Sequence, residues 1–503
     1  MKKGFLKNTL FFSAATFISR VLGYIRDATI AYIFGANALT DAFFVAWRIP
    51  NTLRQLVAEG SFNAAFIPIY TSLEKKDSNY AKLYVSSLFS FYTLTLSVIT
   101  VVVVVFSDFF VSLIAPGLSE KGTLDEAGDI LKIVFPYLIL VGWVSFFMAL
   151  LNTRERFFIP AVSPALLNLS FIFSAFFLTE YLGIYSLAVG AIIGGIFQVV
   201  LQIPFLISEG LVPRFSLRYV NEIKKTLIKL LPAFASFGVS QFAFIVDTVI
   251  ASFLLGGAIS YLYYANRIFQ LPIGIFAIGL GNALLVSLSR HFSDGNREGF
   301  KNDLSMGVRF AIFVSIPATA GMIVLGKEII HLLLQRGEFS QSDTSATFTA
   351  LVGYSVGLIG YALSRPYKSA FFSTGDTKTP LYSTIFGLIV SVVLAVVFGF
   401  VLDWGVFGLA LASSIGGISG FLYLYCLSDF EIDKKSAVKT LINSLLSAAF
   451  MVLVIYLVKA VFPSVYIQVL AGIPVGMLVY FFASYLMKEE MLSALISIFK
   501  RRI

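Results

Sequence analysis

Long apolar stretches alternate with short polar loops along the whole chain. Each stretch is about 20 residues or longer, the length that an α-helix needs to cross the hydrocarbon core of a bilayer. Cutting the chain at its polar or charged loops predicts an all-α integral membrane protein with fourteen transmembrane helices. The predicted helices cover residues 8–34, 39–72, 80–107, 129–153, 159–180, 185–208, 222–254, 259–290, 302–326, 345–372, 380–401, 405–427, 437–460 and 466–487.

The second and eighth predicted helices are too long for a straight crossing. Pro50 and Pro272 lie inside them, and proline removes a backbone donor and disturbs the helix. Irregular helices at membrane depth are tolerated where they are buried in protein or line a water-filled cavity. We therefore expect both segments to bend and to line a cavity.

Composition supports the membrane assignment and excludes several other classes. Hydrophobic residues make up 58% of the chain and charged residues only 13%, whereas soluble domains carry about 25% charged residues. Cys426 is the single cysteine and His291 and His331 are the only histidines, so neither a disulfide nor a His/Cys metal site is indicated. No cofactor is expected. The N-terminal apolar run lacks a small-residue cleavage site, so we interpret it as a retained first helix.

The loops carry their basic residues on alternate sides. If the N-terminus is cytoplasmic, only Lys121, Lys327, Arg336 and Lys459 fall in outer loops, and clusters such as Arg214, Arg218, Lys224 and Lys225 fall inside. Basic residues concentrate in cytoplasmic loops of membrane proteins, so both termini are predicted to be cytoplasmic. The net charge of +9 thus reflects topology and attraction to anionic headgroups, which argues against a nucleic-acid partner.

The chain also repeats itself at a period of about 220 residues. The segment from Leu182 to Gly195 aligns with that from Trp404 to Gly417, and Asp27 aligns with Asp247. Six helices per repeat is an even number, so the halves should share one orientation, as in parallel-repeat transporters. The predicted domains are two six-helix lobes, 1–215 and 216–430, and a C-terminal helix pair, 431–503.

Four arginines inside apolar stretches are the main candidates for chemistry: Arg20, Arg26, Arg54 and Arg267. Arginine stays charged and matches phosphate or carboxylate oxygens, so several at bilayer depth indicate a buried anion-binding cavity. Snorkelling to the headgroups is the structural alternative for Arg20 and Arg26, and for Arg267 it is an ion pair with Asp247. Arg309 and Arg365 lie near helix ends and are expected to snorkel.

Four carboxylates accompany these arginines: Asp27, Asp41, Glu59 and Asp247. Asp27 shares a helix face with Arg20, two turns away, and could be a functional group or a structural counter-ion. Asp247 stands in an apolar stretch, where it could bind a cation, carry a proton or pair with Arg267. No P-loop, dinucleotide fingerprint or Ser/His/Asp set stands out, so ATP is not expected to power the chain directly.

Several motifs resemble one known family. They are Ser19-Arg-Val-Leu-Gly-Tyr-Ile-Arg-Asp27, Thr40-Asp-Ala-Phe-Phe-Val-Ala46, Ile49-Pro-Asn-Thr-Leu-Arg54, Ala58-Glu-Gly-Ser-Phe-Asn63, Tyr264-Ala-Asn-Arg-Ile-Phe-Gln-Leu-Pro272, Gln335-Arg-Gly-Glu-Phe339 and Thr374-Gly-Asp-Thr-Lys-Thr-Pro380. Together they closely resemble the MurJ (MviN) lipid II flippases, and the resemblance covers nearly the whole chain.

This resemblance implies the MOP exporter fold, in which two six-helix lobes form a V around a cationic cavity and two further helices form a groove for an isoprenoid tail. It implies a transporter, not an enzyme, that moves undecaprenyl-diphosphate-linked disaccharide-pentapeptide to the outer leaflet of the bacterial inner membrane for peptidoglycan synthesis. By motif, the substrate-binding residues are Arg20, Arg26, Asp27, Arg54 and Arg267, with Asp41 and Glu59 in supporting roles.

The resemblance also bears on coupling and partners. Some members bind sodium near the position of Asp247, but the helix at 380–401 lacks the Asn and Asp expected as co-ligands. Coupling to Na⁺ or to the membrane potential is left open. The expected form is a monomer in contact with membrane lipids, with the cell-wall synthesis or division machinery as a candidate partner.

Three rival functions predict different sequence features. A cation-coupled exporter of the same superfold would use a less basic cavity and would need the last two helices less. A membrane enzyme acting on lipid-linked sugars would show a catalytic carboxylate pair or a metal motif, and none stands out. A flippase for another polyprenyl-diphosphate glycan is separated from the main interpretation only by the family resemblance.

Overall fold

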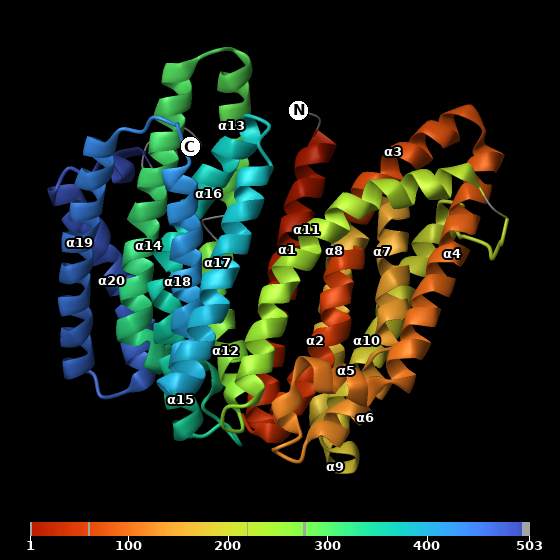
Figure 1. The fold of residues 1–503 in the computed structure, drawn as a ribbon, viewed down its shortest axis with the longest axis horizontal. Helices are drawn as coiled ribbons and strands as arrows, with labels where there is room; N and C mark the ends of the chain where they lie inside the picture. The colour runs from red at the N-terminus through yellow and green to blue at the C-terminus, as the bar shows by residue number, and fades with distance from the viewer. Residues whose placement is uncertain (1–2, 59–60, 219, 275–277, 495–503) are drawn as a thin grey trace. The chain divides into compact units, whose positions relative to one another are not determined.

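The computed structural model describes residues 3–58, 61–218, 220–274 and 278–494. Throughout these ranges the chain is built of helices joined by turns and short loops, with no strand among the described residues. Long apolar segments favour this outcome because a helix satisfies its backbone hydrogen bonds within the segment, and the bilayer core offers no water to replace them. The predicted all-α class is confirmed (Figure 1).

Ten helical segments within the described ranges are long and apolar enough to cross a membrane. They are Ser78–Val105, Leu124–Thr153, Phe158–Phe177, Tyr185–Ser208, Arg297–Leu334, Gln341–Ser373, Lys378–Val401, Gly405–Cys426, Lys434–Val461 and Val465–Leu486. Each coincides with one predicted span. The other four predicted spans, 8–34, 39–72, 222–254 and 259–290, are also helical where the structure describes them, and they hold the candidate arginines and Asp247.

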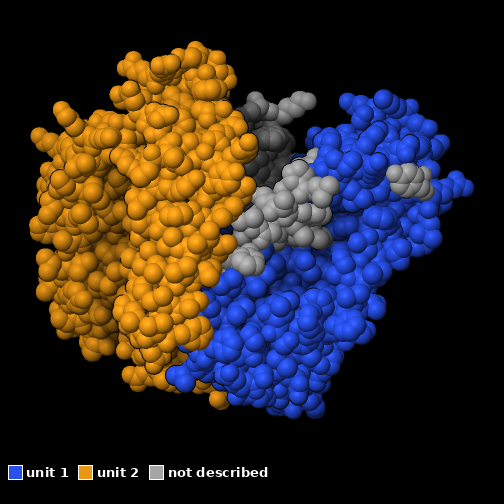
Figure 2. All heavy atoms as spheres, viewed as in Figure 1, with its two compact units in different colours: residues 1–259 blue, residues 260–503 orange. Residues whose placement is uncertain are grey.

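The helices divide into two compact units, residues 1–259 and 260–503, which Figure 2 colours separately. The first unit contains α1 (Lys3–Phe34), α2 (Ala38–Ala58), α3 (Ser61–Lys76), α4 (Ser78–Val105), α5 (Ser107–Ile114), the 3₁₀ helix η1 (Pro116–Leu118), α6 (Leu124–Val134), α7 (Tyr137–Thr153), α8 (Phe158–Phe177), α9 (Thr179–Leu182), α10 (Tyr185–Ser208) and α11 (Asn221–Ser252). Helix α12 (Ala258–Pro272) begins at the boundary.

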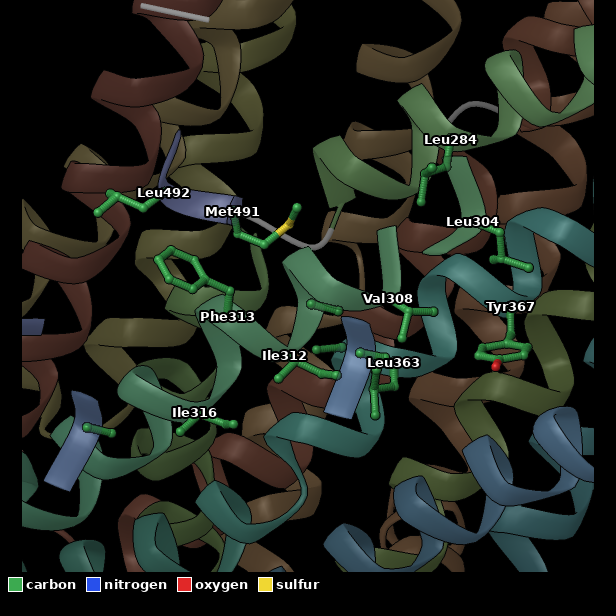
Figure 3. Close-up of a cluster of buried hydrophobic side chains, with 14 of the residues drawn as sticks. Leu284, Leu304, Val308, Ile312, Phe313, Ile316, Leu363, Tyr367, Met491 and Leu492 are labelled. Atoms are coloured by element: carbon green, nitrogen blue, oxygen red, sulfur yellow. The ribbon is translucent and has the colours of Figure 1, made fainter. Parts of the chain in front are cut away.

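The second unit continues with α13 (Ile278–Ser293), α14 (Arg297–Leu334), α15 (Gln341–Val356), α16 (Leu358–Ser373), α17 (Lys378–Val396), the π-helical turn η3 (Val397–Val401), α18 (Gly405–Cys426), α19 (Lys434–Val461) and α20 (Val465–Leu486). Its core lies around α14. Figure 3 shows Ile312, Phe313 and Ile316 of α14 gathered with Leu284 of α13, Leu363 and Tyr367 of α16, and Met491 beyond α20.

The two over-long spans behave differently at their prolines. The α-helical bonding of α12 ends at Pro272, and residues 273–274 are π-helical, so this helix is disturbed next to its proline. Helix α2, in contrast, continues through Pro50 to Ala58. Residues 59–60 and 275–277, which separate the two helices of each span, lie outside the described residues.

The internal repeat is visible in backbone conformation. Gly183 and Gly405, aligned by sequence, have φ values of 52° and 53°, and Gly183 lies two residues before α10 while Gly405 is the first residue of α18. Glu155 and Gly375, 220 positions apart, also have positive φ values of 58° and 84°. Positive φ is readily adopted by glycine and is uncommon for other residues, so the two halves turn their chains at matching places.

Glycines allow close packing of the corresponding helix pairs. In the α8–α10 pair, a Cβ at Gly190 would lie 2.9 Å from Ser174 Cβ. In the α17–α18 pair, a Cβ at Gly387 would lie 2.5 Å from the Gly416 carbonyl oxygen, and one at Gly416 would lie 2.5 Å from the Gly387 carbonyl oxygen. Both backbones can approach this closely only because these positions carry no side chain.

Candidate functional site

A short turn sets the positions of the charged residues on α1 and α2. Helix α1 ends at Phe34 because Gly35 adopts a φ of 65°. The Asn37 side chain then accepts hydrogen bonds from the backbone N–H groups of Leu39 and Thr40, each at 3.0 Å, which starts α2. The turn leaves Arg26 and Asp27 two turns before the end of α1, and places Asp41 in the first turn of α2.

Arg26 and Asp27 form a buried ion pair. Arg26 Nη2 and Nε lie 2.7 and 3.0 Å from Asp27 Oδ1, and the two residues are 8% and 3% exposed. Successive helical positions point 100° apart, yet the long arginine side chain spans this angle. Buried charges are stable only when paired and hydrogen-bonded, so Arg26 is held inside the protein and does not extend to the headgroups.

Two residues of α8 complete the surroundings of Arg26. Asn168 Oδ1 accepts a hydrogen bond from Arg26 Nη1 at 3.2 Å, while Asn168 Nδ2 donates to the Ser19 carbonyl oxygen at 3.0 Å. The Arg26 guanidinium carbon lies 5.5 Å from the centre of the Phe171 ring, within the range of cation–π attraction. Trp47 of α2 packs edge-on against the same ring at 5.1 Å. The guanidinium is therefore fixed from three sides.

The remaining candidate arginines of the first unit are less enclosed. Arg20 lies on α1 with an exposed side chain. Arg54 is half-buried on α2, where its Nε donates to Asn51 Oδ1 at 2.9 Å. Arg48, one turn and a half earlier on α2, donates to the Thr248 hydroxyl of α11. Helices α1 and α2 thus carry four arginines, with Asp27 as the carboxylate bonded to Arg26.

Asp41 lies apart from these arginines, at the other end of α2. It is fully buried, its Oδ2 accepts a hydrogen bond from the Gly257 backbone N–H at 2.8 Å, and it lies 3.9 Å from Lys121 Nζ. Burial lowers the pKa of Lys121, although the neighbouring carboxylate acts in the opposite direction. Thirteen residues of α2 separate Asp41 from Arg54, about 20 Å along the helix, so Asp41 does not share their site.

Near Asp41, a second contact joins η1 to the end of α11. The Gly117 N–H donates to Ser252 Oγ at 3.0 Å, and a Cβ at Gly117 would lie 2.3 Å from the Ser252 carbonyl oxygen. Lys121 Nζ also donates to the Leu255 carbonyl oxygen at 3.4 Å. The segment between α11 and α12 is therefore bonded to η1, to the following loop and to α2. We name Asp41, Gly117, Lys121, Ser252 and Gly257 the latch.

The other predicted residues are placed as follows. Asp247 lies half-buried on α11, immediately before Thr248. Arg267 lies half-buried on α12, with its guanidinium carbon 6.0 Å from the ring centre of Tyr263, one turn earlier. Asp247 belongs to the first unit and Arg267 to the second, so their pairing remains a prediction. Glu59 lies outside the described residues.

The prediction that the Arg309 side chain extends to the headgroups is wrong. It lies on α14 with 9% exposure, its Nε donates to Thr440 Oγ1 at 3.0 Å, and its Nη1 lies 2.8 Å from Glu490 Oε2. Glu489, only 2% exposed, accepts from Thr440 at 2.8 Å and lies 3.5 Å from Arg309 Nη2. Sequence alone does not predict these partners, which lie about 130 and 180 residues away. Arg365 is exposed on α16.

The described residues contain no group of three or more His, Cys, Asp or Glu side chains that could hold a metal ion. The chemistry available at Arg26, Arg54 and Arg267 is the binding of an anion by guanidinium groups at membrane depth, which needs no bond to be made or broken.

The long apolar helices define a multi-pass helical membrane protein, and its fold is like that of solved MOP-superfamily proteins. A multidrug-resistance MATE transporter of that superfamily, solved in an inward-facing conformation, matches with a TM-score of 0.65 at 15% identity and covers 86% of this chain and 94% of its own. At this identity the likeness concerns the fold.

Closer relatives identify the family. The family model described as "Lipid II flippase MurJ" matches residues 30–474, and the chain belongs to this family. The probable lipid II flippase MurJ of Aquifex aeolicus is 37% identical over 500 residues, covering 98% of this chain and 97% of its own. Its counterpart in Vibrio cholerae is 34% identical over 439 residues, covering 84% and 83%.

A solved structure agrees with this membership. The structure described as "Lipid II flippase MurJ, inward closed conformation" matches with a TM-score of 0.83 at 30% identity, covering 96% of this chain and all of the other. The chain is therefore a multi-pass inner-membrane protein of a transporter family, not an enzyme, as the motifs predicted.

Proposed function

We propose that this protein flips lipid II, the undecaprenyl-diphosphate-linked peptidoglycan precursor, from the cytoplasmic to the outer leaflet of the inner membrane. Family membership supports the substrate. The observation that carries the proposal within this chain is the buried Arg26, oriented by Asp27, Asn168 and Phe171 at membrane depth. An oriented guanidinium matches the geometry of diphosphate oxygens.

The diphosphate needs more positive charge than Arg26 supplies. Asp27 neutralises much of the charge of Arg26, and Arg20, Arg54 and Arg267 would bring further guanidinium groups to the anion. Arg54 and Arg267 are half-buried and Arg20 is exposed, so these side chains are accessible in a way that Arg26 is not. We propose that Arg26 shapes the site and that the other three contact the diphosphate, with Glu59 in a supporting role.

The isoprenoid tail would stay in lipid along α19 and α20. Both helices present large apolar side chains outward, including Leu453 and Leu457 at 60% and 63% exposure and Leu470 and Leu478 at 69% each. The pair is attached to α14 by the Lys459–Glu328 ion pair at 2.6 Å and by Tyr480, whose hydroxyl donates to the Phe313 carbonyl oxygen at 2.7 Å. A fixed helix pair with an apolar outer face suits a long hydrocarbon chain.

Transport would follow alternating access between two six-helix lobes, residues 1–215 and 216–430, with residues 431–503 serving the tail. In this proposal the fourteen spans leave both termini in the cytoplasm. The protein would work as a monomer, next to the cell-wall synthesis or division machinery. In the chain with Cys426→Ser, labelling of Glu120→Cys and of Lys434→Cys from each side of the membrane tests the orientation.

The energy source is proposed to be the membrane potential. An anion that moves outward across an inside-negative membrane gains about 2.3 kcal/mol per charge per 100 mV. Asp247 as a sodium ligand is the alternative, and it predicts that flipping requires Na⁺ and that Asp247→Asn abolishes this requirement.

Complementation of a cell depleted of its own lipid II flippase tests the proposal. The unsubstituted chain is expected to restore growth, whereas at least two of Arg26→Ala, Arg54→Ala and Arg267→Ala should fail at normal membrane levels. Arg156→Ala is the matched control, because Arg156 forms an exposed ion pair with Glu209 at 2.9 Å, away from the proposed site. Growth with all three alanine variants would refute the proposed roles.

A further inference from the structure

The segment between α10 and α11 is extended and is bonded along its length to α4. The backbone N–H of Arg214 donates to Ser86 Oγ at 3.1 Å, and that of Ser216 donates to Ser90 Oγ at 2.8 Å. Ser87 Oγ donates to Ser216 Oγ at 3.4 Å. Figure 1 shows this segment, residues 211–218, as the loop beside α4.

The spacing of the two serines on α4 matches the spacing of the two backbone N–H groups that they bind. Ser86 and Ser90 are four residues apart on a helix, a rise of about 6 Å, and Arg214 and Ser216 are two residues apart in extended chain, about 6.6 Å. Pro213 favours extended backbone at the residue before it. The serines therefore fix both the position and the direction of the segment.

This position coincides with a change in the surface of α4. Before Ser86, the exposed residues of α4 include Asn79 and Lys82. After Ser90 they are apolar with the exception of Thr95, and include Phe91, Leu94, Val98 and Val101, at 43%, 53%, 55% and 61% exposure. A change from polar to apolar exposed residues on a membrane helix marks the boundary between headgroups and acyl chains. The segment therefore lies at that boundary.

The segment exposes both apolar and basic side chains, a mixture that suits the boundary between headgroups and acyl chains. Val212, Phe215 and Leu217 are 50%, 70% and 72% exposed, which is unfavourable in water. Arg214 and Arg218 are exposed between and beside them, and Lys224 follows on α11. Glu222, the nearby acid, is bonded to Tyr80 at 2.7 Å and to Lys225 at 3.3 Å. The surface is thus apolar and basic together.

We propose that residues 212–218 form an interfacial anchor that binds anionic phospholipid. Phe215 and Leu217 would enter the outer part of the acyl region, and Arg214 and Arg218 would bind lipid phosphates. Apolar insertion and electrostatic attraction to anionic headgroups act together in such anchors. The anchor is separate from the arginines on α1, α2 and α12, so it does not depend on the identity of the transported substrate.

Because Cys426 is the single cysteine, a label can be directed to the anchor. The full chain with Cys426→Ser and Phe215→Cys is labelled with bimane and reconstituted in phosphatidylcholine vesicles. A small, equal fraction of brominated phosphatidylglycerol or brominated phosphatidylcholine is then added. We expect the brominated phosphatidylglycerol to quench the label at least threefold more strongly. A label at Val101→Cys, on the apolar surface of α4, should show a ratio near one.

The roles of Arg214 and Arg218 in lipid binding are tested in the same labelled protein. In Arg214→Gln/Arg218→Gln the quenching ratio at residue 215 should fall to near one, while quenching at residue 101 is unchanged and so reports an intact fold. Raising the ionic strength should lower the ratio in the protein that keeps both arginines, because salt screens charges at the surface. An absence of quenching at residue 215, or an equal ratio with and without the arginines, would overturn the proposal.

Discussion

At the scale of single residues, Arg26 owes its position to two neighbours from α8 as well as to Asp27. A buried guanidinium whose carboxylate lies next to it in sequence could adopt several orientations. Asn168 and Phe171 of α8 select one of them, and Asn168 also holds the Ser19 carbonyl oxygen, which lies two turns from Arg26 on α1. Asn168 is therefore a positioning residue for the proposed diphosphate site.

Replacing Asn168 tests this role. Asn168→Ala removes one hydrogen bond to a charged group, worth about 1.5–3 kcal/mol, so flipping of lipid II by reconstituted protein should slow by about tenfold or more. Leu169→Ala is the matched control, because Leu169 is 47% exposed, and its flipping rate should stay near that of the unsubstituted protein. An Asn168→Ala protein that flips at the full rate would show that Arg26 does not need this partner.

Sequence singled out Arg26 and Asp27 because charges inside apolar runs are conspicuous. It could not predict Asn168, which is neutral, lies 142 positions from Arg26 and has no local signature on its helix. Nor could it predict that Asp41 would be separated from the arginines, because this depends on which loop packs on the start of α2. Residue type identified the charges, whereas their partners depend on tertiary packing.

At the scale of helices, close glycine contacts hold repeat-related pairs together. Gly387→Ala should destabilise the α17–α18 pair, because its Cβ would lie 2.5 Å from a backbone oxygen that cannot move independently of its helix. We expect a fall of several degrees in the apparent Tm of the purified protein. Gly321→Ala on α14 has no atom within 4 Å of the added Cβ, and its Tm should be unchanged or slightly raised. Equal effects of the two substitutions would refute this packing role.

The attachment of α19 and α20 to α14 depends on a buried carboxylate. Arg309→Met leaves Glu489 buried without its basic partner, which typically costs about 3–5 kcal/mol. Arg309→Met/Glu489→Met should be more stable than Arg309→Met alone, because the unpaired charge is removed as well. Thermal unfolding of the two variants measures the difference, and a double variant no more stable than the single one would contradict the importance of the pair.

Hydropathy located the helices well and their interruptions less well. The described parts of the fourteen predicted spans are helical except for short turns, such as those at Phe106, Leu178 and Gly357, because the bilayer leaves the backbone little alternative. The irregularities depend on finer features. The α-helical bonding of α12 ends at Pro272, but α2 runs through Pro50. A proline inside a helix is tolerated where neighbours satisfy the freed carbonyl, and sequence alone does not reveal those neighbours.

At the scale of the whole molecule, the proposed cycle is driven neither by a chemical gradient nor by ATP. The membrane potential should then change its rate. In vesicles carrying a potassium diffusion potential, lipid II flipping should accelerate several-fold when the side from which lipid II leaves is negative, and slow when the potential is reversed. Identical rates at both polarities would exclude the potential as the driving force, and a strict need for Na⁺ would favour Asp247 as the coupling site.

The central claim is that arginines on α1, α2 and α12 carry a lipid-linked diphosphate across the bilayer. The most direct measurement is transfer of fluorescent lipid II between leaflets of vesicles containing only this protein, followed by the fraction of label protected from an added quencher. We predict rapid transfer with the unsubstituted chain and transfer at the protein-free rate with Arg54→Ala/Arg267→Ala. Transfer that is no faster than in protein-free vesicles, or that persists in the double variant, would contradict the account.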